Sequence, residues 1–246
     1  MAIQKSEAIV LKTHHFRETS LIVHFFTRDF GKIHGLIKGI RNEPQRYGGL
    51  PLSFSRNQII FYERPQSDLH LVTQCDAEEG YAGIRTDLQK THYAQYFIEL
   101  LDCVTENNDK NEHLFELMAK ALGALAQGIT PSWYIARSFE IKLLNLSGFK
   151  PRLDSCVHCQ GAPLGQGRFS ALLGGILCGH CASSDKSAKV VLKGSLASIE
   201  YIENAPWEKA LQLKIAPAIG KELEEIVCNF LEVHLDKQSK VRKFLI

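Results

Sequence analysis

Four of the chain's seven cysteines form two closely spaced pairs, and this spacing constrains the fold more than any other feature of the sequence. The pairs occur as CVHC and CGHC, with 18 residues between them. Two thiolates separated by two residues approach one ion from the same tight turn, and two such turns facing each other form a tetrahedral thiolate shell that suits zinc. We therefore predict one zinc ion held by Cys156, Cys159, Cys178 and Cys181.

The predicted zinc site is expected to be structural. Four protein ligands leave no open position for water, which a catalytic zinc ion needs. His158 and His180, inside the pairs, are interpreted as bystanders. The alternatives are fortuitous cysteines and a redox dithiol, but neither pair lies between a strand and a helix of a βαβ unit. The other three cysteines fall in strand or helix patterns and are predicted to be buried apolar residues: Cys75, Cys103 and Cys228.

The first 80 residues are predicted to form strands and tight turns. Five short runs are rich in Val, Ile, Phe and Leu: SEAIVLK, SLIVHFFT, KIHGLIKG, NQIIFYE and LHLVTQC. Asp29 to Gly31 suits a hairpin turn between the second and third runs. Five strands in about 75 residues, with no long helical pattern among them, predict a small closed barrel such as an OB-fold.

From about residue 85 the apolar residues recur with helical spacing. Helices are predicted over residues 87–104 and 112–126. A third helix is predicted to open at Thr130, a cap residue, with Pro131 at the first helical position, and to stop at Gly148.

The organisation of the whole chain follows from these patterns. Residues 152–182 form a Gly- and Cys-rich insert without helical periodicity, and helices resume after it, most clearly over 220–235. The predicted fold class is α+β. An OB-fold domain occupies residues 1–80, and a helical domain that contains the four-cysteine insert occupies residues 81–246.

Charge is distributed unevenly along the chain. Residues 1–60 carry nine basic and four acidic side chains, an excess of +5, whereas residues 61–130 have an excess of −7 and the remainder +4. A basic N-terminal module suggests contact with a polyanion, although an unevenly charged solvated surface explains the same numbers equally well. No apolar run approaches the roughly 18 residues of a membrane span, and the first residues lack signal-peptide features, so we expect a cytoplasmic protein.

Motifs of the common catalytic classes are missing from the sequence. There is no phosphate-binding P-loop, no dinucleotide-binding glycine fingerprint after a strand, no H-E-x-x-H, no G-x-S-x-G and no zinc-deaminase pattern. The S-x-x-K spelled by residues 183–186 is attributed to chance in a polar loop. We therefore expect a protein that is not an enzyme.

Several segments match the pattern of one known protein family, in the family's order along most of the chain. The stretch EAIVLKTHHFRETSLIVHFFTRDFGKIHGLIKGIR contains Arg-Glu-Thr-Ser, then T-R-x-x-G-K and K-G-x-R, and RYGGLPLSFSRNQIIFY resembles the family's turn into its next strand. The insert LDSCVHC…GRFSALLGGILCGHC resembles the family's zinc segment, and the basic ending QSKVRKFLI is also similar. On these segments the chain resembles the RecO family of DNA repair proteins.

The resemblance implies a fold and a function. It implies an N-terminal OB-fold and a C-terminal helical domain, which carries a zinc motif in many members. It implies binding of single- and double-stranded DNA and annealing of complementary strands, including strands coated with single-strand DNA-binding protein. It also implies contact with the acidic C-terminal tail of that protein, and cooperation with RecR, and in some pathways RecF, to load RecA without nucleotide hydrolysis.

Basic residues of the first domain are the predicted DNA contacts, because a single strand is held by a positive groove and by aromatic faces that accept bases. Lys38 and Arg41 are the first choice, since they lie where a strand enters a Gly-containing loop, and Tyr47 of that loop is a candidate for base stacking. Glu43 departs from the more basic loop of the family, so we expect weaker duplex affinity. The full predicted set is Lys12, Arg17, Lys32, Lys38, Arg41, Arg46, Tyr47 and Arg56.

Other residues receive structural or open interpretations. Arg28 is expected to be a turn residue paired with Asp29, and Phe25 and Phe26 are expected to be barrel core and edge. Four residues near the C-terminus are either a receptor for an acidic, hydrophobic tail or a solvated basic end: Lys240, Arg242, Lys243 and Phe244. Two functional alternatives remain, a protein-interaction adaptor without DNA binding and a dithiol oxidoreductase that uses the cysteine pairs.

Overall fold

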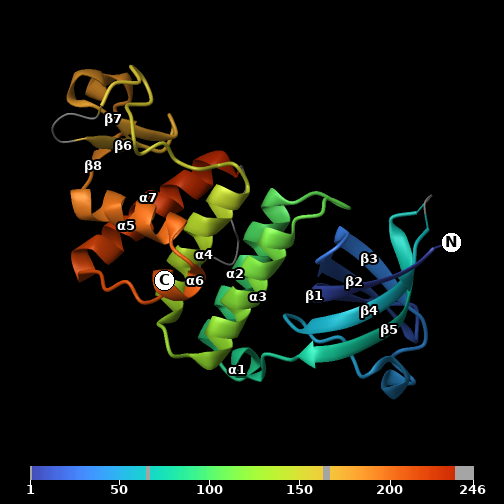
Figure 1. Ribbon diagram of the computed structural model, residues 1–246. Coiled ribbons are helices and arrows are strands. Elements are labelled where there is room, and N and C mark those ends of the chain that lie inside the picture. Colours follow the sequence, from blue (N-terminus) through green and yellow to red (C-terminus); the bar gives the residue numbers. More distant parts are fainter. Residues whose placement is uncertain (1, 65–66, 163–166, 236–246) are drawn as a thin grey trace. The chain divides into compact units, whose positions relative to one another are not determined.

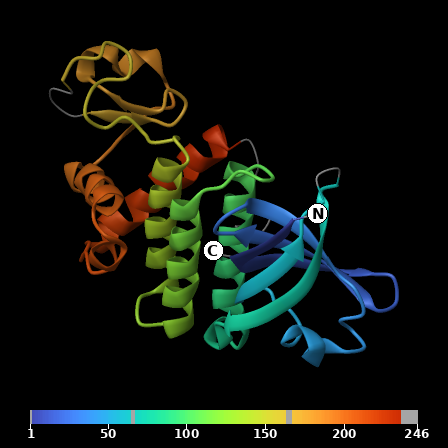
Figure 2. The same cartoon turned by 45° about the vertical axis from the view of Figure 1, so that its right-hand side comes forward.

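The computed structural model describes residues 2–64, 67–162 and 167–235. The chain divides into two compact units, a first that runs to Ile129 and a second that begins at Thr130. In Figures 1 and 2 the blue to teal strands form the barrel of the first unit, and the yellow and orange segments contain a small sheet of the second. No helix among the described residues is long and apolar enough to cross a membrane.

Five strands close into a barrel in the order β1-β2-β3-β5-β4. Neighbouring strands are antiparallel except β3 and β5, which run parallel, so the predicted OB-fold arrangement is confirmed. β1 and β5 extend beyond the predicted apolar runs because their polar ends still pair with β2 and β4. The strands are β1 (Ile3–Phe16), β2 (Ser20–Thr27), β3 (Gly31–Ile37), β4 (Arg56–Tyr62) and β5 (Leu69–Glu79).

The turn between β2 and β3 lies at the predicted hairpin position and depends on a glycine. Gly31 has a φ of +65°, and a Cβ built there would lie 2.1 Å from the backbone oxygen of Asp109. Thr27 Oγ1 accepts a hydrogen bond from the Phe30 N–H at 3.0 Å and donates one to the Gly31 carbonyl at 2.9 Å. Residue 31 must therefore be glycine for the turn to approach residue 109 so closely.

Three helices complete the first unit: α1 (Ala82–Arg85), α2 (Leu88–Val104) and α3 (Glu112–Gln127). The two longer helices match the predicted ones, and the side chains of Asp87 and Asn111 cap their first turns. Phe25 lies in the core cluster of the barrel. Phe26 is also fully buried, but its ring lies 6.2 Å from that of Phe115 on α3. A helix therefore covers part of the outer surface of the barrel.

The second unit contains four helices among its described residues: α4 (Ser132–Leu146), α5 (Lys193–Asn204), α6 (Trp207–Ala210) and α7 (Pro217–His234). The predicted start of α4 was wrong by one residue. Pro131 has an extended ψ of 134° and precedes the helix, and its carbonyl accepts from the Tyr134 and Ile135 N–H groups. Thr130 therefore is not the cap.

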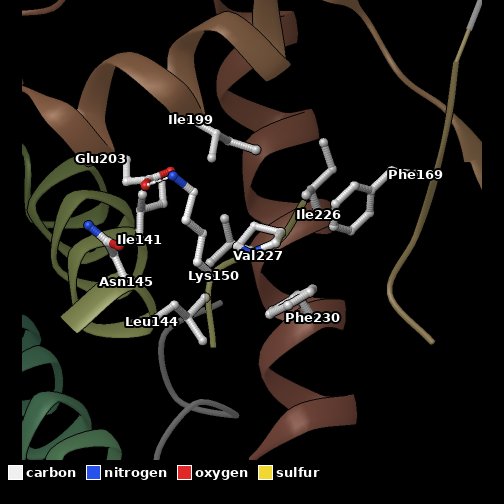
Figure 3. Close-up of a pocket in the computed structure, with 11 residues that line it drawn as sticks. Ile141, Leu144, Asn145, Lys150, Phe169, Ile199, Glu203, Ile226, Val227 and Phe230 are labelled. Carbon is white, nitrogen blue, oxygen red and sulfur yellow. Dashed lines mark ion pairs between the residues drawn. The ribbon is translucent and has the colours of Figure 1, made fainter. Parts of the chain in front are cut away.

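Apolar side chains of α4, α5 and α7 converge in the core of this unit, as Figure 3 shows for Ile141, Ile199 and Val227. The cavity between them measures about 10 Å³, room for about one water molecule. Lys150 and Glu203 form an ion pair at its edge. This space is a packing gap, too small for an organic ligand.

The cysteine-containing insert lies between α4 and α5 and forms a small sheet in the order β7-β6-β8. Its elements are β6 (Arg168–Ser170), β7 (Gly175–Leu177), the 3₁₀-helix η2 (Gly179–Ser184) and β8 (Lys189–Val190). The predicted Gly- and Cys-rich insert ends at residue 182. The sheet extends beyond it, because β8 pairs with β6.

Candidate metal centre and nucleic-acid interface

The four cysteines predicted to bind zinc come together in the folded insert. The Sγ atoms of Cys156, Cys159, Cys178 and Cys181 all lie within 4.8 Å of one another. None of them forms a disulfide, and the Cys159 and Cys178 sulfurs are 3.8 Å apart. This grouping could hold a metal ion. All four donors are thiols, which suits a closed tetrahedral site.

Each cysteine pair occupies a tight turn closed by backbone hydrogen bonds. In the first, the Gln160 N–H donates to the Cys156 carbonyl at 2.8 Å, and Gln160 has a φ of +61°. In the second, the Cys181 N–H donates to the Cys178 carbonyl at 3.0 Å. His158 and His180 are exposed and lie outside the sulfur group, in agreement with their interpretation as bystanders.

The environment of the sulfurs favours a mixture of charged and neutral thiols. Burial raises the pKa of the Cys156 thiol, but N–H groups of Cys159, Cys178 and His158 outweigh burial and lower it to about 6. Burial and hydrogen bonds with the other three thiols raise the pKa of Cys181 to about 12. Four thiols this close cannot all ionise without a cation among them, and a bound metal ion supplies that charge.

A buried carboxylate stabilises the insert beside the sulfurs. Asp185 Oδ2 accepts from Ser170 Oγ at 2.5 Å, and its Oδ1 accepts from the Ser187 N–H at 2.8 Å and from Ser187 Oγ at 2.6 Å. These hydrogen bonds, the one from Ser170 first, lower the pKa of Asp185. They tie β6 to the end of η2.

The remaining cysteines differ in burial, since Cys75 and Cys228 are buried as predicted but Cys103 is only partly buried.

The barrel carries a group of exposed cations at one end. The turn between β1 and β2 meets the segment that follows β3, because the Arg41 N–H donates to the Thr19 carbonyl at 3.0 Å. Arg41 Nη1 also donates to the Glu18 carbonyl at 2.8 Å, which fixes the direction of its side chain. Four predicted DNA contacts are exposed on these segments and the adjoining loop, and we call them the basic rim: Arg17, Lys38, Arg41 and Arg46.

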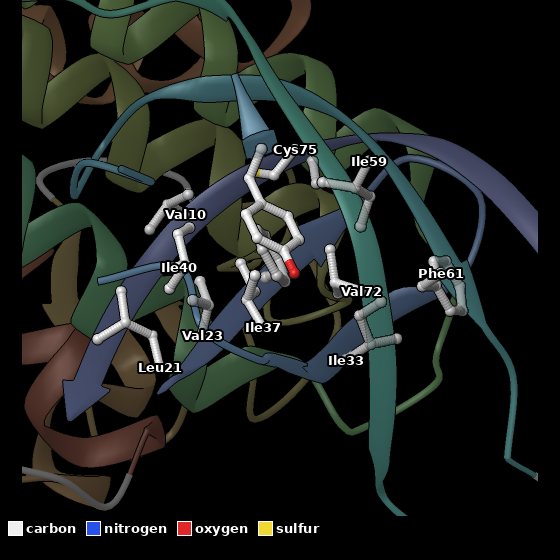
Figure 4. Close-up of a cluster of buried hydrophobic side chains, with 13 residues drawn as sticks. Val10, Leu21, Val23, Ile33, Ile37, Ile40, Ile59, Phe61, Val72 and Cys75 are labelled. Atoms are coloured by element: carbon white, nitrogen blue, oxygen red, sulfur yellow. The ribbon is translucent and has the colours of Figure 1, made fainter. Parts of the chain in front are cut away.

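Tyr47, the predicted base-stacking residue, belongs to the barrel core instead. It ends the short 3₁₀-helix η1 (Pro44–Tyr47), and its side chain is only 8% exposed. Its hydroxyl donates to the Lys38 carbonyl at 2.7 Å, and its ring joins the buried cluster that includes Ile40 and Cys75, two of the side chains labelled in Figure 4. A ring in this position presents no free face to a base, so the stacking role is withdrawn.

The other predicted contacts lie away from the rim and have acidic partners. Lys12 and Lys32 Nζ lie 3.8 and 2.8 Å from the Asp102 carboxylate. Arg56 lies 3.6 and 3.8 Å from the carboxylates of Glu78 and Glu79. Within the rim, Arg46 and Glu43 are 3.9 Å apart, but both side chains are about 70% exposed, so solvent screens this pair. The fold thus gathers four of the eight predicted residues at the rim, buries Tyr47 and places the remaining three cations beside carboxylates.

Arg28 has partners that the sequence did not indicate. Its guanidinium group lies 3.2 Å from Glu7, 3.0 Å from Glu112 and 2.5 Å from Glu116, whereas the expected partner Asp29 accepts from Ser6 Oγ. Burial lowers the pKa of Arg28, but the hydrogen bonds that it donates to the three glutamates, the one to Glu116 first, outweigh burial and raise the pKa. Arg28 therefore joins the barrel to α3, and the expected pairing with Asp29 was wrong.

Comparisons with known proteins cover nearly the whole chain. A family model described as Recombination protein O N terminal matches residues 1–81, and one described as Recombination protein O C terminal matches residues 85–243. A DNA repair protein RecO from Moorella thermoacetica is 31% identical over 243 residues, which cover 98% of this chain and 90% of the relative. One from Alkaliphilus metalliredigens is 33% identical over 237 residues, which cover 95% of this chain and 94% of the relative.

Proposed function

Because this chain belongs to the RecO family of DNA repair proteins, we propose that it binds single- and double-stranded DNA and anneals complementary strands. In this proposal it helps RecR, and in some pathways RecF, to load RecA onto DNA coated with single-strand DNA-binding protein. The proposed location is the cytoplasm, with association to the nucleoid while the protein acts on DNA. None of these steps consumes a nucleotide at this protein.

The observation that carries the proposal is the basic rim at one end of the OB barrel. Lys38, Arg41 and Arg17 are exposed on segments that adjoin each other, as the hydrogen bond from Arg41 N–H to Thr19 shows. Cations that follow a groove or edge of an OB-fold hold a single strand by its phosphates. The bond from Arg41 to the Glu18 carbonyl holds one guanidinium group in place before DNA arrives, which lowers the entropy lost on binding.

We propose zinc as the ion at the cysteine group and a structural role for it. Four thiolate ligands close the coordination shell, so the ion supplies folding free energy to a small sheet rather than a reactive water. The proposed ligands make up half of a buried cluster in the insert, which consists of Cys156, Leu177, Cys178 and Ala188. A segment of this size ordinarily needs a bound metal ion or disulfides to stay folded.

Contact with the acidic C-terminal tail of single-strand DNA-binding protein is a further part of the proposal. The basic and apolar residues suggested for it, Lys240, Arg242, Lys243 and Phe244, lie outside the described residues. Surfaces for this tail and for RecR are therefore best sought by binding measurements with the separate partners.

The test is annealing of two complementary oligonucleotides, each coated with the cognate single-strand DNA-binding protein, without ATP. We expect the full chain to accelerate annealing, and the acceleration to fade as salt rises. A Lys38→Ala/Arg41→Ala double variant should lose most of the acceleration. Lys5→Ala is the matched control, because Lys5 is an exposed cation of β1 that lies outside the predicted set.

Direct DNA binding separates the proposal from its alternatives. The logarithm of affinity for a single strand should fall with the logarithm of salt concentration by about 0.7 per phosphate contact. An adaptor that holds only proteins would show no such binding. A dithiol oxidoreductase would expose at least one readily alkylated thiol, whereas a zinc site protects four until the metal is chelated.

A further inference from the structure

Three histidines lie in a row across neighbouring strands of the barrel. His24 of β2 is paired with His34 of β3, and their ring centroids are 4.2 Å apart. His14 of β1 lies diagonally opposite, with its centroid 5.1 Å from that of His24. His14 is exposed and the other two are partly exposed. We call His14, His24 and His34 the histidine row.

The charged groups around the row leave it with an excess of positive charge. Lys12 is paired with His24 in the β1–β2 register, and Lys32 lies two residues before His34 on β3. Both ammonium groups share one carboxylate, that of Asp102 on α2, at 3.8 and 2.8 Å. Two cations therefore face one anion before any histidine is protonated.

A fourth histidine on β5 adds no acidic partner to the row. His70 is opposite Gly35 in the parallel β3–β5 pairing, and it is buried. Its Nδ1 accepts from the Arg64 N–H at 3.2 Å, and the titratable groups that face it are Glu63, Asp68, His34 and Arg64. Its Nδ1 is thus engaged within the fold, and it does not neutralise His34.

Crowding keeps His24 uncharged while no anion is near. Burial, followed by the proximity of His34, His14 and Lys12, lowers the pKa of His24 to about 4, although Asp102 acts in the opposite direction. Each protonated imidazole disfavours protonation of the next, because like charges this close repel. A phosphate placed against the row would reverse the balance, since an opposite charge favours the protonated form.

We propose that the histidine row is a proton-dependent phosphate-binding surface, on which the backbone of a single DNA strand lies against His14, His24 and Lys12. This inference rests on the proposed function and extends its binding site beyond the basic rim. β2 and β3 connect the two, because His34 lies four residues before Lys38, about 13 Å along a strand. The outer face of the second and third strands is where OB-folds bind oligonucleotides.

The ring geometry favours phosphate over base as the ligand. The planes of His14 and His24 are tilted by 59°, and those of His24 and His34 by 44°. Tilted rings present no flat face on which successive bases can stack. Their N–H groups, once both nitrogens carry protons, are charged donors suited to phosphate oxygens.

The test measures affinity and proton uptake together. The full chain is titrated with a fluorescent oligothymidylate at constant ionic strength at pH 7.5, 6.8 and 6.0, with the melting temperature recorded at each pH. Calorimetry in two buffers of different ionisation enthalpy counts the protons taken up. We expect affinity to rise as pH falls, by at most about tenfold per pH unit for each proton taken up, because binding and protonation are reciprocally linked.

Variants locate the effect. His14→Gln/His24→Gln should lose most of the pH dependence and of the proton uptake, because these two rings are the ones placed against the phosphate. His15→Gln is the matched control, because His15 is an exposed neighbour on the same strand whose side chain points to the opposite face. If the double variant folds poorly, the single substitution His14→Gln replaces it, because His14 is exposed. Its pH dependence and proton uptake should lie between those of the unmodified chain and zero.

Each contrary outcome has a distinct meaning. Salt-dependent binding with no pH dependence and no proton uptake would overturn the histidine row and leave the proposed function standing. A loss of pH dependence as large in His15→Gln as in the double variant would also overturn it. Absence of DNA binding at every pH and salt concentration would overturn both, because the strand is the ligand of the row.

Discussion

Lys32 of β3 donates to Asp102 of α2, with its Nζ 2.8 Å from Oδ1 and 3.3 Å from the Asp102 carbonyl. Only 13% of the Lys32 side chain is exposed. The ammonium group lies near the C-terminal end of α2, where a helix dipole favours a cation. Lys32, which was predicted from the sequence to contact DNA, thus links α2 to the barrel.

We therefore expect Lys32→Met to lower stability more than DNA affinity. Loss of a half-buried ion pair should reduce the free energy of unfolding by about 1 kcal/mol, measured by urea denaturation. Affinity for a single strand at pH 7.5 should fall less than in Lys38→Ala, measured by fluorescence anisotropy. Equal losses of affinity in the two variants would contradict the assignment.

Tyr47→Phe tests whether this residue belongs to the core or to the DNA interface. The substitution removes the hydroxyl that donates to the Lys38 carbonyl at 2.7 Å but keeps the ring in the barrel. We expect the free energy of unfolding to fall by about 1 kcal/mol and the affinity for single-stranded DNA to stay the same. Because Phe stacks on bases as well as Tyr does, Tyr47→Leu provides the second arm. A loss of affinity in Tyr47→Leu beyond its loss of stability would restore the stacking role.

Duplex binding should rank Lys38 above Arg46. Arg46 is 71% exposed and lies 3.9 Å from Glu43, which reduces its attraction for phosphate. Lys38 is exposed, and no ion pair of its side chain is seen among the described residues. We expect Lys38→Ala to weaken duplex binding more than Arg46→Ala and to reduce the slope of log affinity against log salt by about 0.9. The reverse order would show that the loop, rather than the end of β3, contacts the backbone.

The sequence was sufficient for features whose cause is local. The short β-rich runs predicted the five strands, and the cysteine spacing predicted which sulfurs meet, because a two-residue gap defines a turn. It was insufficient where a partner lies far along the chain. Arg28 meets Glu112 and Glu116 only once α3 packs on the barrel, and nothing near Tyr47 indicates that its ring turns inward.

The histidine row could be predicted from the sequence only in part. His14, His24 and His34 recur every ten residues, and tight turns are predicted between the strands that carry them. Placing the turn at Asp29 to Gly31 on the sequence already brings His24 opposite His34. The β-bulge between Val10 and Lys12 has no such signal, yet it sets the phase of the His14 end of β1.

Cys178→Ser tests the structural role of the metal centre. Removal of one of four sulfur ligands should lower the melting temperature and the solubility and should reduce bound zinc, measured by elemental analysis. Cys103→Ser is the control, since Cys103 lies outside the sulfur group. A Cys178→Ser protein that stays well folded but no longer binds one partner would instead assign the metal centre to recognition.

His24 should make the protein sensitive to acid. Its pKa is about 4 in the folded chain, lowered by burial first, against 6.5 for an ordinary histidine, so the unfolded chain binds the proton more tightly. The stabilising contribution of the neutral ring is therefore fully present above pH 6.5 and is lost as pH falls towards 4. His24→Gln cannot take up this proton, so its melting temperature should fall less than that of the unmodified chain between pH 6.5 and pH 4.5. His15→Gln is the control, because His15 is exposed and follows His14 in the sequence. Its melting temperature should fall as much as that of the unmodified chain. If the two variants and the unmodified chain decline in parallel, the ring of His24 is already protonated in the folded state, and the crowding of the histidine row does not suppress its charge.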